Sequence, residues 1–188
     1  MKGIYNEIHF CKFNEDRSTL PQREYMAGSI PFSKTGSQRE LQKYILTRGT
    51  LIGTLLYTVV LNSTTNLESG GELGFIFAFL SMFIRPILHA ICYKTDVYLL
   101  VNTIRLSIVV YGLEDMSKTR FVIMNLMPDI IFGVIPFILF LIFPHYPSLG
   151  TFGAANLALV VGDFRNSKYV IKQMPKRAKM NFYQLHSY

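Results

Sequence analysis

The sequence has few charged residues. Only 16% of its 188 residues are Asp, Glu, Lys or Arg, whereas 50% are hydrophobic, and the mean hydropathy is +0.28. The apolar residues lie in four clusters that are nearly free of charge and are separated by polar or basic stretches. Membrane spans explain such clusters better than a soluble core does. The pattern predicts an α-helical integral membrane protein with about four transmembrane helices.

Cysteine is scarce as well, and the sequence shows neither a secretory signal nor a nucleic-acid-binding motif. The chain has only Cys11 and Cys92, which we expect to be free thiols, one in the N-terminal arm and one at a membrane edge. The first 45 residues contain no apolar stretch of a secretory signal, so the first span is expected to direct insertion. The net charge is +7, but the basic residues flank hydrophobic segments and form no nucleic-acid-binding motif. The expected partner is the lipid bilayer, not nucleic acid.

The hydrophobic clusters divide the chain into three parts. We predict a cytoplasmic N-terminal arm over 1–46, a membrane domain over 47–164 and a basic cytoplasmic tail over 165–188. The arm ends in Ser37-Gln38-Arg39-Glu40, an S-x-x-E capping box from which a helix is expected to run into the first span. The expected spans are roughly 47–62, 73–93, 121–143 and 146–162.

Lysine and arginine are unevenly distributed between the two sides of these spans. Eight lie up to Arg48, none in 63–71, four in 94–120, none in 144–150 and six after residue 164. Cytoplasmic loops carry the excess of basic residues in membrane proteins. The distribution therefore places both termini and the middle loop in the cytoplasm, in a multi-pass protein of the cell membrane. The six basic residues of the tail are also enough to attract anionic lipid.

The middle loop is not simply polar. Val97 to Tyr111 is rich in β-branched and aromatic residues, and Ile104 to Ile108 alternates apolar and polar residues with a period of two. This pattern predicts one or two short β-strands, with a hairpin turn near Asn102-Thr103, and leaves a helix in the membrane interface as the alternative. The strands would offer an edge to which an extended peptide could add, unless the protein itself covers that edge.

Four ionisable residues fall within the predicted spans or at their ends. Arg85 and His89 are one helical turn apart in the second span, Asp129 is in the third, and Asp163 closes the fourth. A charge inside the bilayer costs roughly 2.5–3.5 kcal/mol on insertion scales, so each residue is a functional candidate. Arg85 could form a structural ion pair, snorkel to the interface or bind a ligand. His89 could hydrogen bond between helices or bind metal, and Asp163 could be an ordinary carboxylate at the membrane edge.

Short motifs occur in a characteristic order from about Pro31 to the C-terminus. They precede the first span, end the second, begin the third and close the fourth: Pro31-Phe32-Ser33-Lys34, Ser37–Glu40, Leu88-His89-Ala90, Met116-Ser117-Lys118, Asn125-Leu126-Met127-Pro128, Ala155-Asn156, Gly162-Asp163 and Met174-Pro175-Lys176. In this order and spacing the chain resembles the putative zincin peptidase family of small bacterial membrane proteins. That family is related in layout to site-2-type intramembrane metalloproteases.

The resemblance implies a zinc site that this sequence has largely lost. The second span of the family is expected to carry H-E-x-x-H, whose two histidines bind zinc and whose glutamate activates water. Arg85-Pro86-Ile87-Leu88-His89 stands there instead, with arginine at the first ligand, Pro86 at the general base and only the second histidine retained. The implied third ligand, Asp163, is present. We expect no catalytic residue and no bound metal, with His89 and Asp163 as weak candidate ligands.

One hypothesis and two alternatives follow. The chain is expected to be a catalytically inactive pseudoenzyme of a membrane zinc-metallopeptidase-like family, with no cofactor. It would bind a membrane peptide or protein near the loop strands, in a regulatory, chaperone-like or immunity role. An active zinc peptidase with an atypical site would need a further ligand from His145, His186, Asp129 or Glu114. A small transporter or channel component would rely on intramembrane Arg85 and Asp129.

A buried arginine needs an acidic partner, and the spans offer two. The resemblance favours Asp163, because the aspartate at that position should face the altered motif. Depth favours Asp129, which lies nine residues inside Arg120, just as Arg85 lies nine residues inside Lys94. We expect Asp163 to be the primary partner of Arg85 and Asp129 to share it, with the guanidinium near the position that a metal ion would take.

Overall fold

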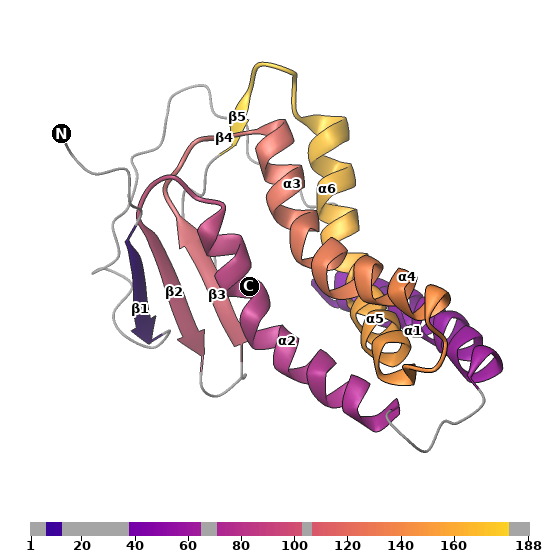
Figure 1. Ribbon diagram of the computed structural model, residues 1–188. Coiled ribbons are helices and arrows are strands. Elements are labelled where there is room, and N and C mark those ends of the chain that lie inside the picture. The colour runs from indigo at the N-terminus through magenta and orange to yellow at the C-terminus, as the bar shows by residue number, and fades with distance from the viewer. Residues whose placement is uncertain (1–6, 13–37, 65–70, 103–106, 181–188) are drawn as a thin grey trace.

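The computed structural model describes residues 7–12, 38–64, 71–102 and 107–180. Within these ranges the chain is mostly helical, and a small sheet lies to one side of the helices (Figure 1). Sequence predictions on Pro31–Lys34, on Ser37, on the turn at Thr103 and on His186 lie outside the described residues.

The helices form two groups along the chain, with strands between the second and the third helix. They are α1 (Gln38–Ser63), α2 (Gly71–Ile91), α3 (Lys118–Asp129), α4 (Ile135–Ile142), α5 (Pro147–Leu159) and α6 (Val161–Gln173), and the π-helical turn η3 (Ile130–Val134) joins α3 to α4. α1 begins at Gln38, inside the sequence predicted to form a capping box, and continues through the first expected span. The amphipathic helix α6 includes residues 165–173 of the segment that was expected only as a basic tail.

Three helical segments in the described part of the chain are long and apolar enough to cross a membrane. They are Gln42–Ser63, Gly71–Ile91 and Lys118–Ile142, the last running through α3, η3 and α4. The fourth expected span, 146–162, differs from the prediction. Most of it forms α5, whose 13 residues extend only about 20 Å, against about 30 Å for the hydrocarbon core of a bilayer.

The composition of α5 explains why this short helix is buried among the other helices. Gly150, Thr151, Gly153, Ala154 and Asn156 are buried, because α5 packs against α1, α2 and α4. Small side chains let neighbouring helices approach closely. The hydropathy of this segment therefore reflects packing inside the helical bundle, whereas the apolar residues of the three longer segments are mostly exposed.

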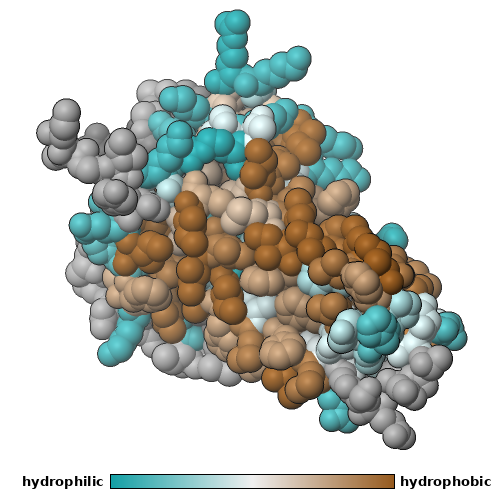
Figure 2. All heavy atoms as spheres, viewed as in Figure 1, coloured by the Kyte–Doolittle hydropathy of each residue, from teal (hydrophilic) through white to brown (hydrophobic). Residues whose placement is uncertain are grey.

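The exposed surface of the longer helices is strongly apolar. Large hydrophobic side chains on α1, α2 and α4 are exposed, including Leu55 at 60%, Phe79 at 56% and Ile142 at 60%. Figure 2 shows a broad apolar surface on one face of the molecule, between hydrophilic regions at the top and at the lower right. Soluble proteins rarely expose contiguous apolar patches of this size, so the surface indicates association with a bilayer.

The middle loop forms a β-hairpin, as predicted. β2 (Val97–Asn102) and β3 (Ser107–Gly112) pair antiparallel, and the alternative of an interfacial helix is wrong. Sequence reasoning missed β1 (Ile8–Lys12), which comes from the N-terminal arm and pairs parallel to β2, giving the order β1-β2-β3. One edge of the predicted hairpin is therefore covered by the protein itself.

A shared core fixes the sheet to the helices. Val97 and Leu99 of β2 pack in one cluster with Ala90 of α2, Met124 of α3 and Val170 of α6. A second small sheet, made of β4 (Met116–Ser117) and β5 (Lys179–Met180), links the start of α3 to the segment after α6. Figure 1 shows β3 as the strand nearest α2, so the sheet lies against the helix that carries Arg85 and His89.

Candidate functional site

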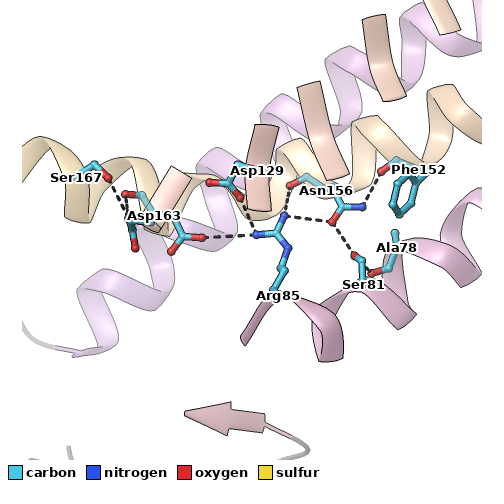
Figure 3. Close-up of polar contacts among 9 residues, drawn as sticks. Ala78, Ser81, Arg85, Asp129, Phe152, Asn156, Asp163 and Ser167 are labelled. Atoms are coloured by element: carbon cyan, nitrogen blue, oxygen red, sulfur yellow. Dashed lines mark hydrogen bonds and ion pairs between the residues drawn. The ribbon is translucent and has the colours of Figure 1, made fainter. Parts of the chain in front are cut away.

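Arg85 lies on the buried face of α2 and points toward α3, α5 and α6 (Figure 3). Its Nη1 atom lies 2.7 Å from Asp129 Oδ1 and 3.6 Å from Asp163 Oδ2. The side chain of Asp129 is 4% exposed and that of Asp163 is 27% exposed. The structure thus corrects the expected order of partners. Asp129 is the closer one, because it lies at the same depth as Arg85, and Asp163 shares the guanidinium from the edge.

A widened helical turn follows Asp129 directly. In η3 (Ile130–Val134) the N–H of Ile135 donates to the carbonyl of Ile130, five residues back instead of four. Such a turn changes the angular register between the helical segments before and after it, and these turns are frequent at functional sites. Pro136 comes next and has no N–H to donate, so the wider turn sacrifices no hydrogen bond there. The sequence shows the proline but not the turn.

Asn156 of α5 completes the polar contacts around Arg85. Arg85 Nη2 donates to the backbone carbonyl of Asn156 at 3.3 Å and to its Oδ1 at 3.2 Å. Ser81, one turn before Arg85 on α2, donates to the same Oδ1 at 2.8 Å, and Asn156 Nδ2 donates to the carbonyl of Phe152. Sequence reasoning missed Ser81, although its spacing of four residues from Arg85 places it on the same helical face.

A second set of hydrogen bonds holds the backbone of Asp163 in place. Asn125 of α3 donates through Nδ2 to the carbonyl of Asp163 at 2.6 Å and to the hydroxyl of Ser167 at 3.0 Å. Asn125 and Ser167 are buried, and their helices pack side by side. The start of α6 is therefore fixed against α3 by Asn125, which belongs to a motif noted in the sequence, and by Ser167, which the sequence analysis did not single out. This contact keeps the Asp163 carboxylate beside Arg85.

Arg85, Asp129, Asp163 and His89 do not fit a zinc ion. Zinc in proteins is held by imidazole, thiolate and carboxylate groups, and a catalytic site needs three of them. Here the guanidinium of Arg85 already binds both carboxylates, and His89 is the one imidazole of the altered motif. Its Nε2 atom is buried and has no hydrogen-bond partner in the described part of the chain. Among residues 7–12, 38–64, 71–102 and 107–180, no group of three or more His, Cys, Asp or Glu could hold a metal.

The other ligands suggested by the sequence lie elsewhere. His145 follows α4 at the far end of the bundle, where its ring contacts that of Tyr146 at 4.3 Å between centroids. Glu114 accepts a hydrogen bond from the side chain of Arg120 and another, at 2.6 Å, from the backbone N–H of Lys94. Neither residue joins the Arg85 site. Asp129 does join it, but its carboxylate is paired with Arg85, and His186 lies outside the described residues.

Glu114 serves instead as a link between the sheet and the helices. Burial would raise the pKa of its carboxyl, but the hydrogen bonds from Arg120 and from the Lys94 backbone outweigh burial and lower it. Arg120 also donates to the carbonyl of Cys92 at 2.8 Å. The connection after β3, the start of α3 and the end of α2 are thereby joined through one ion pair.

The comparisons with known proteins agree with the resemblance seen in the sequence. A family model described as "Putative zincin peptidase" matches residues 75–179, which cover α2 from its second turn onward, the hairpin and the other helices that contribute to the Arg85 site. No curated protein and no solved structure matches the chain. The family interpretation made from the motifs is confirmed.

Proposed function

The chain belongs to the putative zincin peptidase family, and from this premise we propose that it is a non-hydrolytic member that acts by binding a membrane peptide or protein. The position of Arg85 carries the proposal. Its guanidinium lies between the carboxylates of Asp129 and Asp163, where it supplies a fixed positive charge. An arginine remains protonated at any accessible pH and cannot bind a metal ion or activate a water molecule.

The residue after Arg85 supports the same proposal. Pro86 is buried within α2, at the place where the family motif has its glutamate. Proline can neither accept nor donate a proton, so the described site contains no group in the role of general base at this position. His89 is retained one turn later, but one imidazole cannot replace the two histidines and the glutamate of the motif.

Metal content tests this proposal directly. Protein purified in detergent after growth with zinc should contain far less than one zinc per chain. The double variant Arg85→His with Pro86→Glu restores H-E-x-x-H and is the positive control. A thermal melt of this variant checks its fold, because the change also removes the ion pairs of Arg85. Stoichiometric zinc in the unaltered protein, lost in His89→Ala, would overturn the proposal and support the active peptidase.

We propose further that the chain crosses the membrane four times, with both termini in the cytoplasm. The start of α1 and the start of α6 lie on the same side, because Arg165 stacks over the ring of Tyr44 at 4.8 Å. α5 runs back from the end of α4 toward this side and is shielded by other helices, so it can cross without the length of a lipid-facing span. The basic residues at these ends support a cytoplasmic location.

Cysteine labelling in intact cells tests this orientation. In a background with Cys11→Ser and Cys92→Ser, a cysteine at Ser69 should react with a membrane-impermeant maleimide, whereas one at Ser107 should react only after lysis. Labelling of Ser107 but not of Ser69 from outside would reverse the orientation.

The proposed peptide contact is the sheet beside α2. The core that joins Val97, Leu99 and Ala90 holds the strands against the helix with the altered motif, and both lie in the family-matched region. Backbone pairing with a strand is a common way to bind an extended peptide. A photo-crosslinking residue at Val109 of β3 should therefore give a discrete protein adduct in cells, whereas one at lipid-exposed Ile138 should not. Equal adducts at both positions would argue against a peptide site on the sheet.

A further inference from the structure

Apart from the Arg85 site, helix α1 lies close both to the end of α5 and to the start of α6. A Cβ added at Gly49 of α1 would lie 2.6 Å from the carbonyl oxygen of Ala158, at the end of α5. A Cβ added at Gly162 of α6 would lie 3.3 Å from Ile45 Cδ1. These close contacts bring long side chains from the N-terminal parts of α1 and α6 next to one another. We call this contact between the two helices the seam.

Two arginines use this seam to share one aromatic ring. The Cζ atom of Arg165, on α6, lies 4.8 Å from the ring centroid of Tyr44, and that of Arg48, on α1, lies 6.0 Å from the same centroid. Arg165 is also 5.4 Å from the ring centroid of Tyr169. Stacking on aromatic rings holds the guanidinium groups in place, but the two like charges repel each other. An anion bound between them would offset that repulsion.

The surroundings of this pair are basic. Residues 38–48 of α1 and α6 together carry six basic residues and two acidic ones, Glu40 and Asp163. Among the basic residues Lys43, Arg48 and Lys168 are exposed. The field at the seam is therefore positive in spite of the two carboxylates, and it favours a ligand with negative charge.

The face of α1 that carries Tyr44 and Arg48 becomes apolar one turn further on. Leu51 and Leu55 follow with helical spacing on the same face and are 52% and 60% exposed. Leu51 and Leu55 belong to a candidate membrane span that begins at Gln42. A ligand on this face would thus meet cations and an aromatic ring at one end and an apolar surface at the other, which suits a phospholipid better than a soluble phosphate.

We propose that Arg48, Arg165 and Tyr44 form a binding site for the phosphate of an anionic phospholipid, whose acyl chains lie along Leu51 and Leu55. This site is separate from the Arg85 site and does not depend on the chain being a pseudoenzyme. It would hold one lipid in a defined place, in addition to any diffuse attraction between the basic tail and the membrane.

Native mass spectrometry of the full-length protein in detergent tests the site. Phosphatidylglycerol should bind at low micromolar concentration and phosphatidylcholine should not. Arg48→Gln, an exposed change that leaves the fold intact, should weaken phosphatidylglycerol binding by about tenfold. Arg48→Gln with Arg165→Gln should weaken it further, whereas the control Lys176→Gln with Arg177→Gln, which removes the same charge after α6, should change it less than twofold.

Each other outcome would overturn the proposal. An equal loss in the control variant would show diffuse attraction to basic residues, and unchanged binding in a folded Arg48→Gln protein would place the lipid elsewhere. Competition by millimolar inorganic phosphate or glycerol phosphate would identify a soluble anion as the ligand. A thermal melt of each variant separates loss of binding from loss of fold.

Discussion

The two halves of α5 hold the bundle together by different means. In the N-terminal half, two glycines let α4 pack closely because they have no side chain. A Cβ at Gly150 would lie 2.7 Å from Phe140 Cγ, and one at Gly153 would lie 2.6 Å from Phe137 N. In the C-terminal half, Asn156 accepts and donates hydrogen bonds in the Arg85 site. The first half fits by shape, and the second by polar contacts.

The difference shows how the membrane environment affects each contact. Lipid tails are as apolar as the side chains that they surround, so helices gain little by burying apolar surface and depend on close packing and hydrogen bonds. Packing of Gly150 and Gly153 sets the distance between α4 and α5. The polar contacts of the C-terminal half also fix the relative orientation of the helices, because Arg85 contacts oxygen atoms from α3, α5 and α6 at the same time. Substitutions in the two halves should therefore lower stability by different mechanisms, overpacking in the N-terminal half and loss of polar contacts in the C-terminal half.

The largest effect is expected from Arg85→Leu. The change leaves the carboxylates of Asp129 and Asp163 without their cation, and removing one partner of a buried pair costs about 3–5 kcal/mol. Unfolding in mixed micelles with increasing sodium dodecyl sulfate measures the loss. Arg39→Leu, which removes an exposed arginine of α1, is the control and should change stability by less than about 0.5 kcal/mol.

Two double variants identify the partner of Arg85. Arg85→Leu with Asp129→Asn should recover most of the lost stability, because the buried charge disappears together with its partner. Arg85→Leu with Asp163→Asn should recover less, because Asp163 is 27% exposed and its oxygen is 3.6 Å from the guanidinium. Greater recovery with Asp163→Asn would restore the order of partners expected from the sequence. If neither double variant recovers, the buried ion pair does not stabilise the fold.

Gly153→Ala tests the contact by shape and should have the next largest effect. Its methyl group would meet the backbone of Phe137 and the carbonyl of Gly133, at 2.6 and 2.9 Å, and the backbone cannot move aside without displacing α4. Overpacking of this kind costs typically about 1–3 kcal/mol. Gly162→Ala is the control, since its methyl would meet only the end of the Ile45 side chain at 3.3 Å. Equal losses in the two variants would mean that the close contact of Gly153 with Phe137 does not decide the result.

Sequence reasoning captured those parts of the protein in which local pattern and global structure coincide. Runs of apolar residues gave the three long helical segments, and alternation gave the hairpin β2–β3, because both depend on neighbours in the chain. β1 could not be predicted in this way. Its pairing joins His9 to Tyr98 across most of the N-terminal half, and nothing in five residues of the arm specifies such a distant partner.

The site could be predicted from the sequence only in part, for a similar reason. Arg85, Asp129 and Asp163 were identified because charged residues in apolar helices are unusual, whereas Asn156 was noted only as part of a short motif. The distances among them depend on how α2, α3, α5 and α6 pack together, and no local residue pattern specifies that packing. The expectation that Asp163 would be the nearest carboxylate followed the family layout, whereas the structure gives that place to Asp129.

The smallest effect is expected where the sheet meets the helices, from Glu114→Gln. This substitution removes the charge that accepts from Arg120 and from the Lys94 backbone, while the shape of the side chain is kept. A charge-assisted hydrogen bond that is partly accessible to water contributes about 1 kcal/mol, so the melting temperature at pH 7 should fall by roughly 2–4 °C.

The pH dependence distinguishes this contact from the buried pair in the bundle. Because the hydrogen bonds lower the pKa of Glu114 below its ordinary value of 4.5, the folded protein keeps the carboxylate ionised at a pH where the unfolded chain takes up a proton. Its contribution is therefore complete above that ordinary pKa and disappears as the pH falls through the lower, folded-state pKa. The difference in melting temperature between the unaltered protein and Glu114→Gln should be constant from pH 6 to pH 8 and should shrink as the pH falls below about 4. A difference that persists unchanged to pH 3 would show that the side chain stabilises the junction through its neutral contacts, and that the sheet, like the N-terminal half of α5, is held mainly by shape.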